Sequence, residues 1–166
     1  MVVPRAAQRG VMFPETTIVL ATEAHLREML SWLRQEERET SEGFYCNREI
    51  IIESQKQGEV WCAVTRSMVV GFVVQTRKTV GASIDILEVK PQCRGQGLGK
   101  MLAIGAIERL FKSGAEFITV RCAPRDSEPF WKSLGFQPTE TPLRSVWDSP
   151  RLVLRQEHNY VFNRTR

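Results

Sequence analysis

The sequence predicts a single domain of the α/β class. Its 166 residues suit one compact unit with a core of its own. β-prone and amphipathic segments alternate along the chain, and residues 83 to 113 combine a strand, a glycine-rich turn and a helix. With 42% hydrophobic and 25% charged residues, the composition is that of an ordinary globular protein.

The first ordered elements are expected from Thr16 onward. Residues 18 to 20 form a short β-prone run, and Thr22 is a suitable N-cap for a helix. In that helix, apolar residues recur at i, i+3, i+4 and i+7, which predicts one buried face. This face is formed by Leu26, Met29, Leu30 and Leu33. A charged tail follows from residue 34 to residue 42.

A second helix is predicted to begin at Asn47 and to end before Gly58. Residues 60 to 65 and 68 to 76 are rich in β-branched and aromatic side chains. Only two residues separate these runs, so they predict a β-hairpin.

The strand predicted next, residues 83 to 89, must leave the sheet near Pro91, because proline has no N–H for the ladder. An amphipathic helix follows Gly99 and ends at Gly114. The remaining elements are a strand at 117 to 120, a short helix at 128 to 134 and a strand at 151 to 155.

These elements place the domain at residues 16 to 157, with a loose leader at 1 to 15 and a tail at 158 to 166. No apolar stretch is long enough for a signal peptide or a membrane span, so no membrane association is expected. The four cysteines form no Cys-x-x-Cys pair. We therefore expect no metal and reduced thiols in the cytoplasm. The net charge of +4 is spread over scattered basic residues, so nucleic acid is not an expected partner.

The turn at residues 94 to 99 reads Arg-Gly-Gln-Gly-Leu-Gly. Alternate glycines leave backbone N–H groups uncovered, and the helix that begins here adds its own free N–H groups and the positive end of its dipole. Such a turn suits a pyrophosphate, to which Arg94 and Lys100 are expected to add positive charge. A turn that merely joins strand to helix is the alternative.

Other glycine-rich phosphate motifs do not fit this spacing. A Walker loop would need glycine at position 94 and serine or threonine at 101, where the chain has Arg94 and Met101. A dinucleotide fingerprint would need glycine at 100 or 102, where the chain has Lys100 and Leu102.

Residues 87 to 99 resemble the signature of the GNAT superfamily of N-acetyltransferases, Gln/Arg-x-x-Gly-x-Gly/Ala, through Arg94, Gly97 and Gly99. Residues 130 to 136, Phe-Trp-Lys-Ser-Leu-Gly-Phe, resemble the family's second landmark. The order of elements is also similar to that of the family. The resemblance implies the GNAT fold, an α/β (α+β) arrangement with a central, mixed, twisted sheet of six to seven strands and helices on both faces.

The resemblance also implies acetyl-CoA as co-substrate and an amine as acceptor. In this family the thioester lies where two parallel central strands splay apart, here residues 83 to 89 and 117 to 120. An amine attacks it directly, and a backbone N–H near a strand bulge stabilises the oxyanion. The implied cofactor-binding residues are Leu87, Glu88, Val89, Arg94, Gly95, Gln96, Gly97, Leu98, Gly99, Lys100, Ser127 and Trp131.

The amine must lose a proton before it attacks, so a carboxylate base is expected. Asp85 and Glu88 are the candidates. Because their positions differ by an odd number, strand alternation places them on opposite faces, and only one can face the acceptor. For each, a solvated or salt-bridged strand carboxylate is the alternative interpretation.

Trp131 stands where many family members have a tyrosine that protonates the leaving CoA thiolate. An indole N–H donates a hydrogen bond but gives up no proton near neutral pH. Water, Ser127 or Cys122 are possible substitutes. A domain that binds acyl-CoA with weak or no catalysis, in a regulatory or binding role, therefore stays open beside the N-acetyltransferase.

The acceptor is expected to be a small molecule or a peptide, and the resemblance implies that it binds near the first two helices. Their carboxylates, Glu36, Glu37, Glu39 and Glu42, either attract a cationic amine or form a solvated helix end. A basic nucleic-acid or protein-binding module is a third hypothesis, and a homodimer is left open.

Overall fold

A computed structural model describes residues 15 to 41, 43 to 140 and 148 to 156. The strands are β1 (Thr17–Leu20), β2 (Val60–Thr65), β3 (Met68–Arg77), β4 (Ala82–Val89), β5 (Phe117–Arg121), β6 (Gln137–Pro138) and β7 (Arg151–Arg155). The helices are α1 (Glu23–Thr40), α2 (Arg48–Lys56), α3 (Leu98–Lys112) and α4 (Glu128–Ser133), with 3-10 turns at Tyr45–Asn47, Pro91–Cys93 and Arg125–Ser127.

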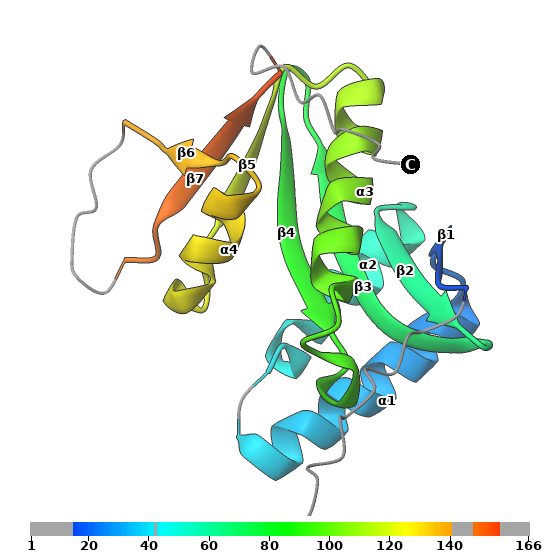
Figure 1. The fold of residues 1–166 in the computed structure, drawn as a ribbon. Coiled ribbons are helices and arrows are strands. Elements are labelled where there is room, and N and C mark those ends of the chain that lie inside the picture. The colour runs from blue at the N-terminus through cyan, green and yellow to red at the C-terminus, as the bar shows by residue number, and fades with distance from the viewer. Residues whose placement is uncertain (1–14, 42, 141–147, 157–166) are drawn as a thin grey trace, which may run out of the picture.

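The strands form one mixed sheet of seven strands in the order β1-β2-β3-β4-β5-β7-β6 (Figure 1). Only the β4–β5 pair is parallel among these described strands. The expected α/β fold with a mixed sheet is confirmed, as is the hairpin of β2 and β3. The sequence did not predict β6, because its two residues are too few to show an alternation and one of them is Pro138.

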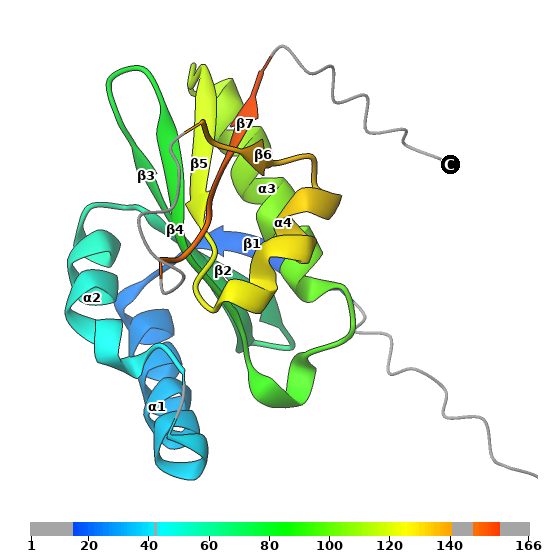
Figure 2. The same ribbon diagram turned by 90° about the vertical axis from the view of Figure 1, so that its left-hand side faces the viewer.

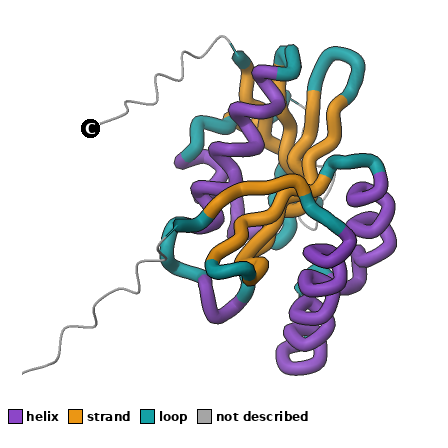
Figure 3. Tube along the Cα trace, turned by 90° about the vertical axis from the view of Figure 1, so that its right-hand side faces the viewer, coloured by secondary structure: helices purple, strands orange, loops and turns teal. Residues whose placement is uncertain are grey.

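Helices cover both faces of the sheet, as Figures 2 and 3 show. On one face α3 and α4 pack through Leu102, Leu110 and Trp131 against strand residues such as Ile118. On the other face α1 and α2 pack through residues that include Met29, Leu33 and Ile51 against Phe72 and Ile86. The predicted apolar stripe of α1 is therefore its core face.

The caps of the first two helices differ. Thr22 caps α1 as predicted, since its Oγ1 accepts a hydrogen bond of 3.3 Å from the backbone N–H of His25. Asn47 makes no side-chain cap bond, and a 3-10 turn leads directly into α2. No helix in the described ranges is long and apolar enough to cross a membrane. The predicted leader and tail lie outside the described residues, apart from Glu15.

The two central parallel strands are paired over only part of their length. Residues Ala82, Ser83 and Ile84 of β4 pair with β5, whereas β4 continues to Val89. Toward their C-terminal ends the two strands separate (Figure 1). Along residues 85 to 89, the edge of β4 that faces β5 therefore has no strand partner in the described part of the chain.

A β-bulge lies where this separation begins. Val74 of β3 pairs with Ile86, but the next residue, Gln75, pairs with Ile84. Asp85 is therefore the extra residue in β4. A bulge of this kind resets the alternation of side chains along the strand, which decides how the candidate bases are placed.

Candidate active site

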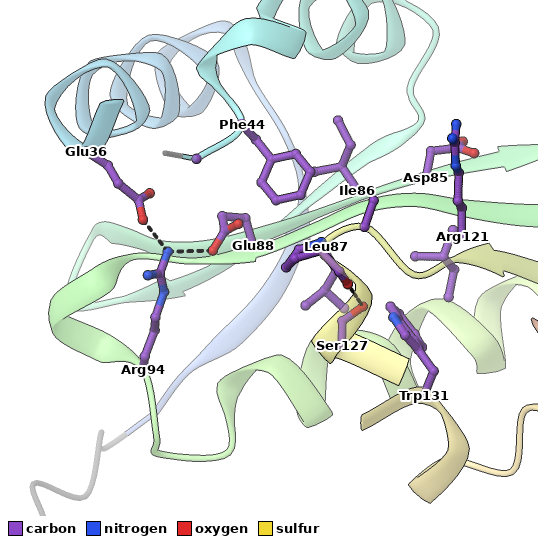
Figure 4. A pocket seen from close by; sticks show the side chains of 14 residues that line it. Glu36, Phe44, Asp85, Ile86, Leu87, Glu88, Arg94, Arg121, Ser127 and Trp131 are labelled. Carbon is purple, nitrogen blue, oxygen red and sulfur yellow. Dashed lines mark hydrogen bonds and ion pairs between the residues drawn. The ribbon is translucent and has the colours of Figure 1, made fainter. Parts of the chain in front are cut away.

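A cavity of about 320 Å³ lies where β4 and β5 separate. It is bounded by α1, the segment that follows α1, β4, the end of β5 and the start of α4 (Figure 4). We call it the β4–β5 cleft. Its lining residues are Glu36, Gly43, Phe44, Ile84, Asp85, Ile86, Leu87, Glu88, Arg94, Arg121, Ala123, Pro124, Ser127 and Trp131.

The glycine-rich turn lies beside this cleft, at the N-terminus of α3. Gly95 and Gly97 have φ angles of +74° and +81°, and a Cβ added to either would meet no atom within 4 Å. Gly97 is the N-cap of α3 and offers no side-chain capping bond. The first N–H groups of the helix are thus available to an anion, as predicted for a phosphate site.

Two further residues of the turn have different surroundings. The side chain of Leu98 is buried in the core, so only its backbone is available to a ligand. Lys100 is exposed in the first turn of α3, where its charge is free to reach solvent or a ligand. Both stay predicted cofactor-binding residues.

Arg94 joins the turn to both α1 and β4. Its Nη2 donates to Oε1 of Glu36 at 2.6 Å and to Oε1 of Glu88 at 2.7 Å, and its Nε donates to the carbonyl oxygen of Val89 at 2.9 Å. The guanidinium is therefore turned toward the cleft (Figure 4). These bonds use Nε and Nη2, so a phosphate contact from this side chain would come from Nη1, and the role of Arg94 in cofactor binding stays a prediction.

The two carboxylates of this cluster are largely buried. Glu36 is only 7% exposed, and its Oε2 has no hydrogen-bond partner in the described structure. Burial raises the pKa of Glu88, and this effect outweighs the nearby charge and hydrogen bond of Arg94, which lower it. A second carboxylate, Glu36, also raises the pKa of Glu88.

Asp85 and Glu88 lie on the same face of β4, so the prediction of opposite faces is wrong. Glu88 pairs with Phe72, whose side chain packs in the core beneath α1 and α2. Asp85 is directed to that side as well (Figure 4) and accepts a hydrogen bond of 2.7 Å from Oγ1 of Thr76. The bulge explains the difference, because Asp85 is itself the extra residue and its side chain departs from the alternation of the strand.

Residues 33 to 147 match a family model described as the acetyltransferase (GNAT) domain. The chain belongs to the GNAT acetyltransferase family. The match covers more than half of the chain and includes both resembling segments, so the recognition made from the sequence is confirmed.

Solved structures of GNAT proteins share the fold. The PaiA N-acetyltransferase of Thermoplasma acidophilum, in complex with coenzyme A, has a TM-score of 0.69 at 14% identity, over 86% of this chain and 99% of its own. A GNAT acetyltransferase of Brucella melitensis with acetyl-CoA has a TM-score of 0.66 at 13% identity, over 86% and 88%. The ribosomal-protein-S18-alanine N-acetyltransferase of Escherichia coli has a TM-score of 0.64 at 17% identity, over 84% and 91%. No curated protein sequence matches the chain.

In this GNAT domain, α4 brings Trp131, and the 3-10 turn before it brings Ser127, to the cleft wall opposite β4 (Figure 4). Oγ of Ser127 donates to the carbonyl oxygen of Pro124 at 2.7 Å. Cys122 is fully buried and is not part of the cleft lining. Burial raises the pKa of its thiol. Of the predicted substitutes for a tyrosine acid, Ser127 is thus placed at the cleft and Cys122 is not.

Sequence reasoning missed Phe44 and Arg121, which line the cleft from α1's side and from the end of β5. Neither residue stands in a recognisable pattern. It also grouped Glu36 with the solvated carboxylates of the helix end, although Glu36 follows Leu33 by three residues and so continues the buried stripe of α1. That spacing was the signal in the sequence that Glu36 is buried. Glu42, from the same group, lies outside the described residues.

Proposed function

We propose that this GNAT protein is an acetyl-CoA-dependent N-acetyltransferase that acts on a primary amine of a small molecule or peptide. The observation that carries the proposal is the geometry of β4. Its free edge at residues 85 to 89 leads from the bulge at Asp85 directly to the glycine-rich turn. One ligand with an amide-bearing arm and a diphosphate fits both features.

The turn fits the diphosphate because no side chain covers it. Gly95 and Gly97 leave open space where other residues would place a Cβ. Backbone N–H groups of residues 95 to 100 would hold the phosphate oxygens, and Lys100 would add a charge. Backbone groups of Leu87, Glu88 and Val89 would pair with the pantetheine arm in the manner of an added strand.

Acetyl-CoA supplies an activated thioester, and the chain supplies the surroundings of the attack. We assign the base to Asp85, acting directly or through a water molecule, because it lies where the strands separate and faces the cleft. Glu88 is tied to Arg94 and serves to position β4 and the turn. A backbone N–H beside the bulge is available for the negative charge that develops on the thioester oxygen.

As the new N–C bond forms, the C–S bond breaks and CoA leaves as a thiolate. The indole N–H of Trp131 is a cleft donor that can hydrogen-bond to this sulfur, but it cannot supply a proton. A thiol with an ordinary pKa of about 8.5 leaves without full protonation, so the missing acid slows the step without preventing it. The four cysteines are all unpaired, which agrees with the proposed cytoplasmic location.

Trp131 also favours a second candidate, a domain that binds acyl-CoA without efficient transfer. Two measurements on the full chain separate the proposals. The first is thermal stabilisation by CoA, acetyl-CoA and GTP. Ligand at 100 times its Kd adds about 2.7 kcal/mol, which corresponds to about 5 to 10 °C in a domain of this size.

The second measurement is the release of free thiol from acetyl-CoA with a panel of amines, with the amide product identified by mass spectrometry. Stabilisation by the CoA compounds together with amide formation supports the enzyme. Stabilisation with no product from any amine supports the binding domain. If GTP stabilises the protein as well as CoA does, the assigned cofactor site is wrong.

A further inference from the structure

Glu36 is a buried carboxylate with one unused oxygen at the cleft. It projects from α1, is 7% exposed and gives its Oε1 to Arg94. Oε2 has no hydrogen-bond partner among the described residues. An unpaired, buried carboxylate oxygen costs the folded protein free energy, so a positively charged partner at this position would be stabilising.

The charges around Glu36 do not balance. Glu36 and Glu88 both bind the same nitrogen, Nη2 of Arg94, so two carboxylates share one cation. Both hydrogen bonds of Glu88, to Arg94 and to the N–H of Val89, fall on its Oε1. This end of the cleft thus carries one negative charge in excess when both carboxylates are ionised. The C-terminal end of α1, one turn away, adds the negative end of a helix dipole.

The residue that packs against Oε2 of Glu36 has no side chain. Gly43 lines the cleft without a side chain, and a Cβ there would lie 3.4 Å from Oε2 of Glu36. Phe44 and Ile86 lie between the Glu36 cluster and Asp85 (Figure 4). The cleft therefore runs from an acidic end, past an apolar middle, to the proposed base.

We propose that the acceptor is an amine with a second cationic group, separated from the reacting nitrogen by an apolar spacer, and that Glu36 with Glu88 binds this second cation. The inference rests on the proposed function. The reacting amine lies at Asp85, the spacer packs on Phe44 and Ile86, and the distal cation reaches the unused oxygens of the two carboxylates.

Matched acceptors test this directly. Each α,ω-diamine of two to six carbons is compared with the n-alkylamine of the same length and with the corresponding ω-amino acid. We expect kcat/KM for the preferred diamine to exceed that for its monoamine by about tenfold or more, the effect of one charge-assisted bond. Equal values for the pair, or a preference for the ω-amino acid, would overturn the inference.

Substitution of Glu36 distinguishes recognition from a purely structural role. In Glu36→Gln the ratio of kcat/KM for the diamine to kcat/KM for the monoamine should fall toward one. Glu39→Gln, an exposed change of the same kind on α1, is the matched control and should keep the preference. A variant that slows both acceptors equally shows that Glu36 only anchors Arg94, which contradicts the proposal.

Binding gives a readout that does not depend on turnover. Calorimetry of the diamine with the CoA-saturated protein should show saturable binding that Glu36→Gln weakens about tenfold and Glu39→Gln does not. If CoA binds but no amine is acetylated, the proposed enzymatic function is wrong. Diamine binding would in that case still show whether Glu36 and Glu88 form a cation site. Absence of diamine binding to a protein that acetylates monoamines refutes the cation site alone.

Discussion

The substitution Gly97→Val tests the phosphate-binding turn, and its effect on stability follows from the backbone. Gly97 has a φ of +81°, and a Cβ would meet no atom within 4 Å, so the cost is conformational and not a steric clash. A side chain in this left-handed region costs about 1–2 kcal/mol. For a domain of this length, that lowers Tm by about 2 to 8 °C. Calorimetry with CoA should also show binding weakened by tenfold or more, about 1.4 kcal/mol, because valine shields the backbone N–H groups.

Gly58 provides the matched control. Its φ is +74°, a Cβ there would also meet no atom within 4 Å, and it follows α2 outside the cleft lining. Gly58→Val should therefore lose the same stability as Gly97→Val and keep the CoA affinity of the original chain. If both variants bind CoA with unchanged affinity, the turn is not the phosphate site and the reasoning from its open backbone is refuted.

Three further predictions concern the leaving group, the ion-pair cluster and the sheet. Trp131→Tyr should raise kcat, by up to about 100-fold, and add a basic limb to the pH profile near the phenol pKa of about 10, because tyrosine can protonate the thiolate; an unchanged profile contradicts a missing acid. Arg94→Gln removes the positive charge that lowers the pKa of Glu88, so the pKa of that carboxyl should rise further above its ordinary value. Carbon-13 NMR titration measures it, and a fall would show that Arg94 does not act on Glu88. In Gly71→Ala a Cβ would lie 2.9 Å from both the carbonyl oxygen of Glu88 and Cδ1 of Leu102. Thermal unfolding should then show that the free energy of unfolding falls by about 1–3 kcal/mol. An unchanged Tm would contradict this close packing of β3 against β4 and α3.

The strand, the glycine-rich turn and the helix at the cleft were predictable because their determinants are close together in the sequence. The end of a strand, a proline, three alternate glycines and an amphipathic pattern occupy residues 83 to 113. Each acts through local backbone geometry, which strand and helix rules describe directly. The parallel pairing of β4 with β5 followed from the family resemblance and is confirmed.

The placement of the acidic side chains was not predictable in the same way. The bulge at Asp85 arises from pairing with β3, and no residue in β4 signals it. Simple alternation therefore gave the wrong face relation for Asp85 and Glu88. The pairing of Glu36 with Arg94 joins residues 58 positions apart and needs the packed fold to exist first.

The two proposed binding sites differ in the groups that form them. In the proposed site, cofactor recognition would depend on backbone groups and on glycines, which tolerate little variation in the turn itself. Acceptor recognition would depend on side chains of α1 and β4, Glu36 and Glu88, which both bind Arg94. A change at position 36 would remove one of the bonds of Arg94, whereas a change at Arg94 would disturb both binding sites, because the same guanidinium holds the acidic end of the cleft and the end of β4. Arg94 is thus the position at which cofactor and acceptor binding should be coupled, and the coupling should be lost when its charge is removed.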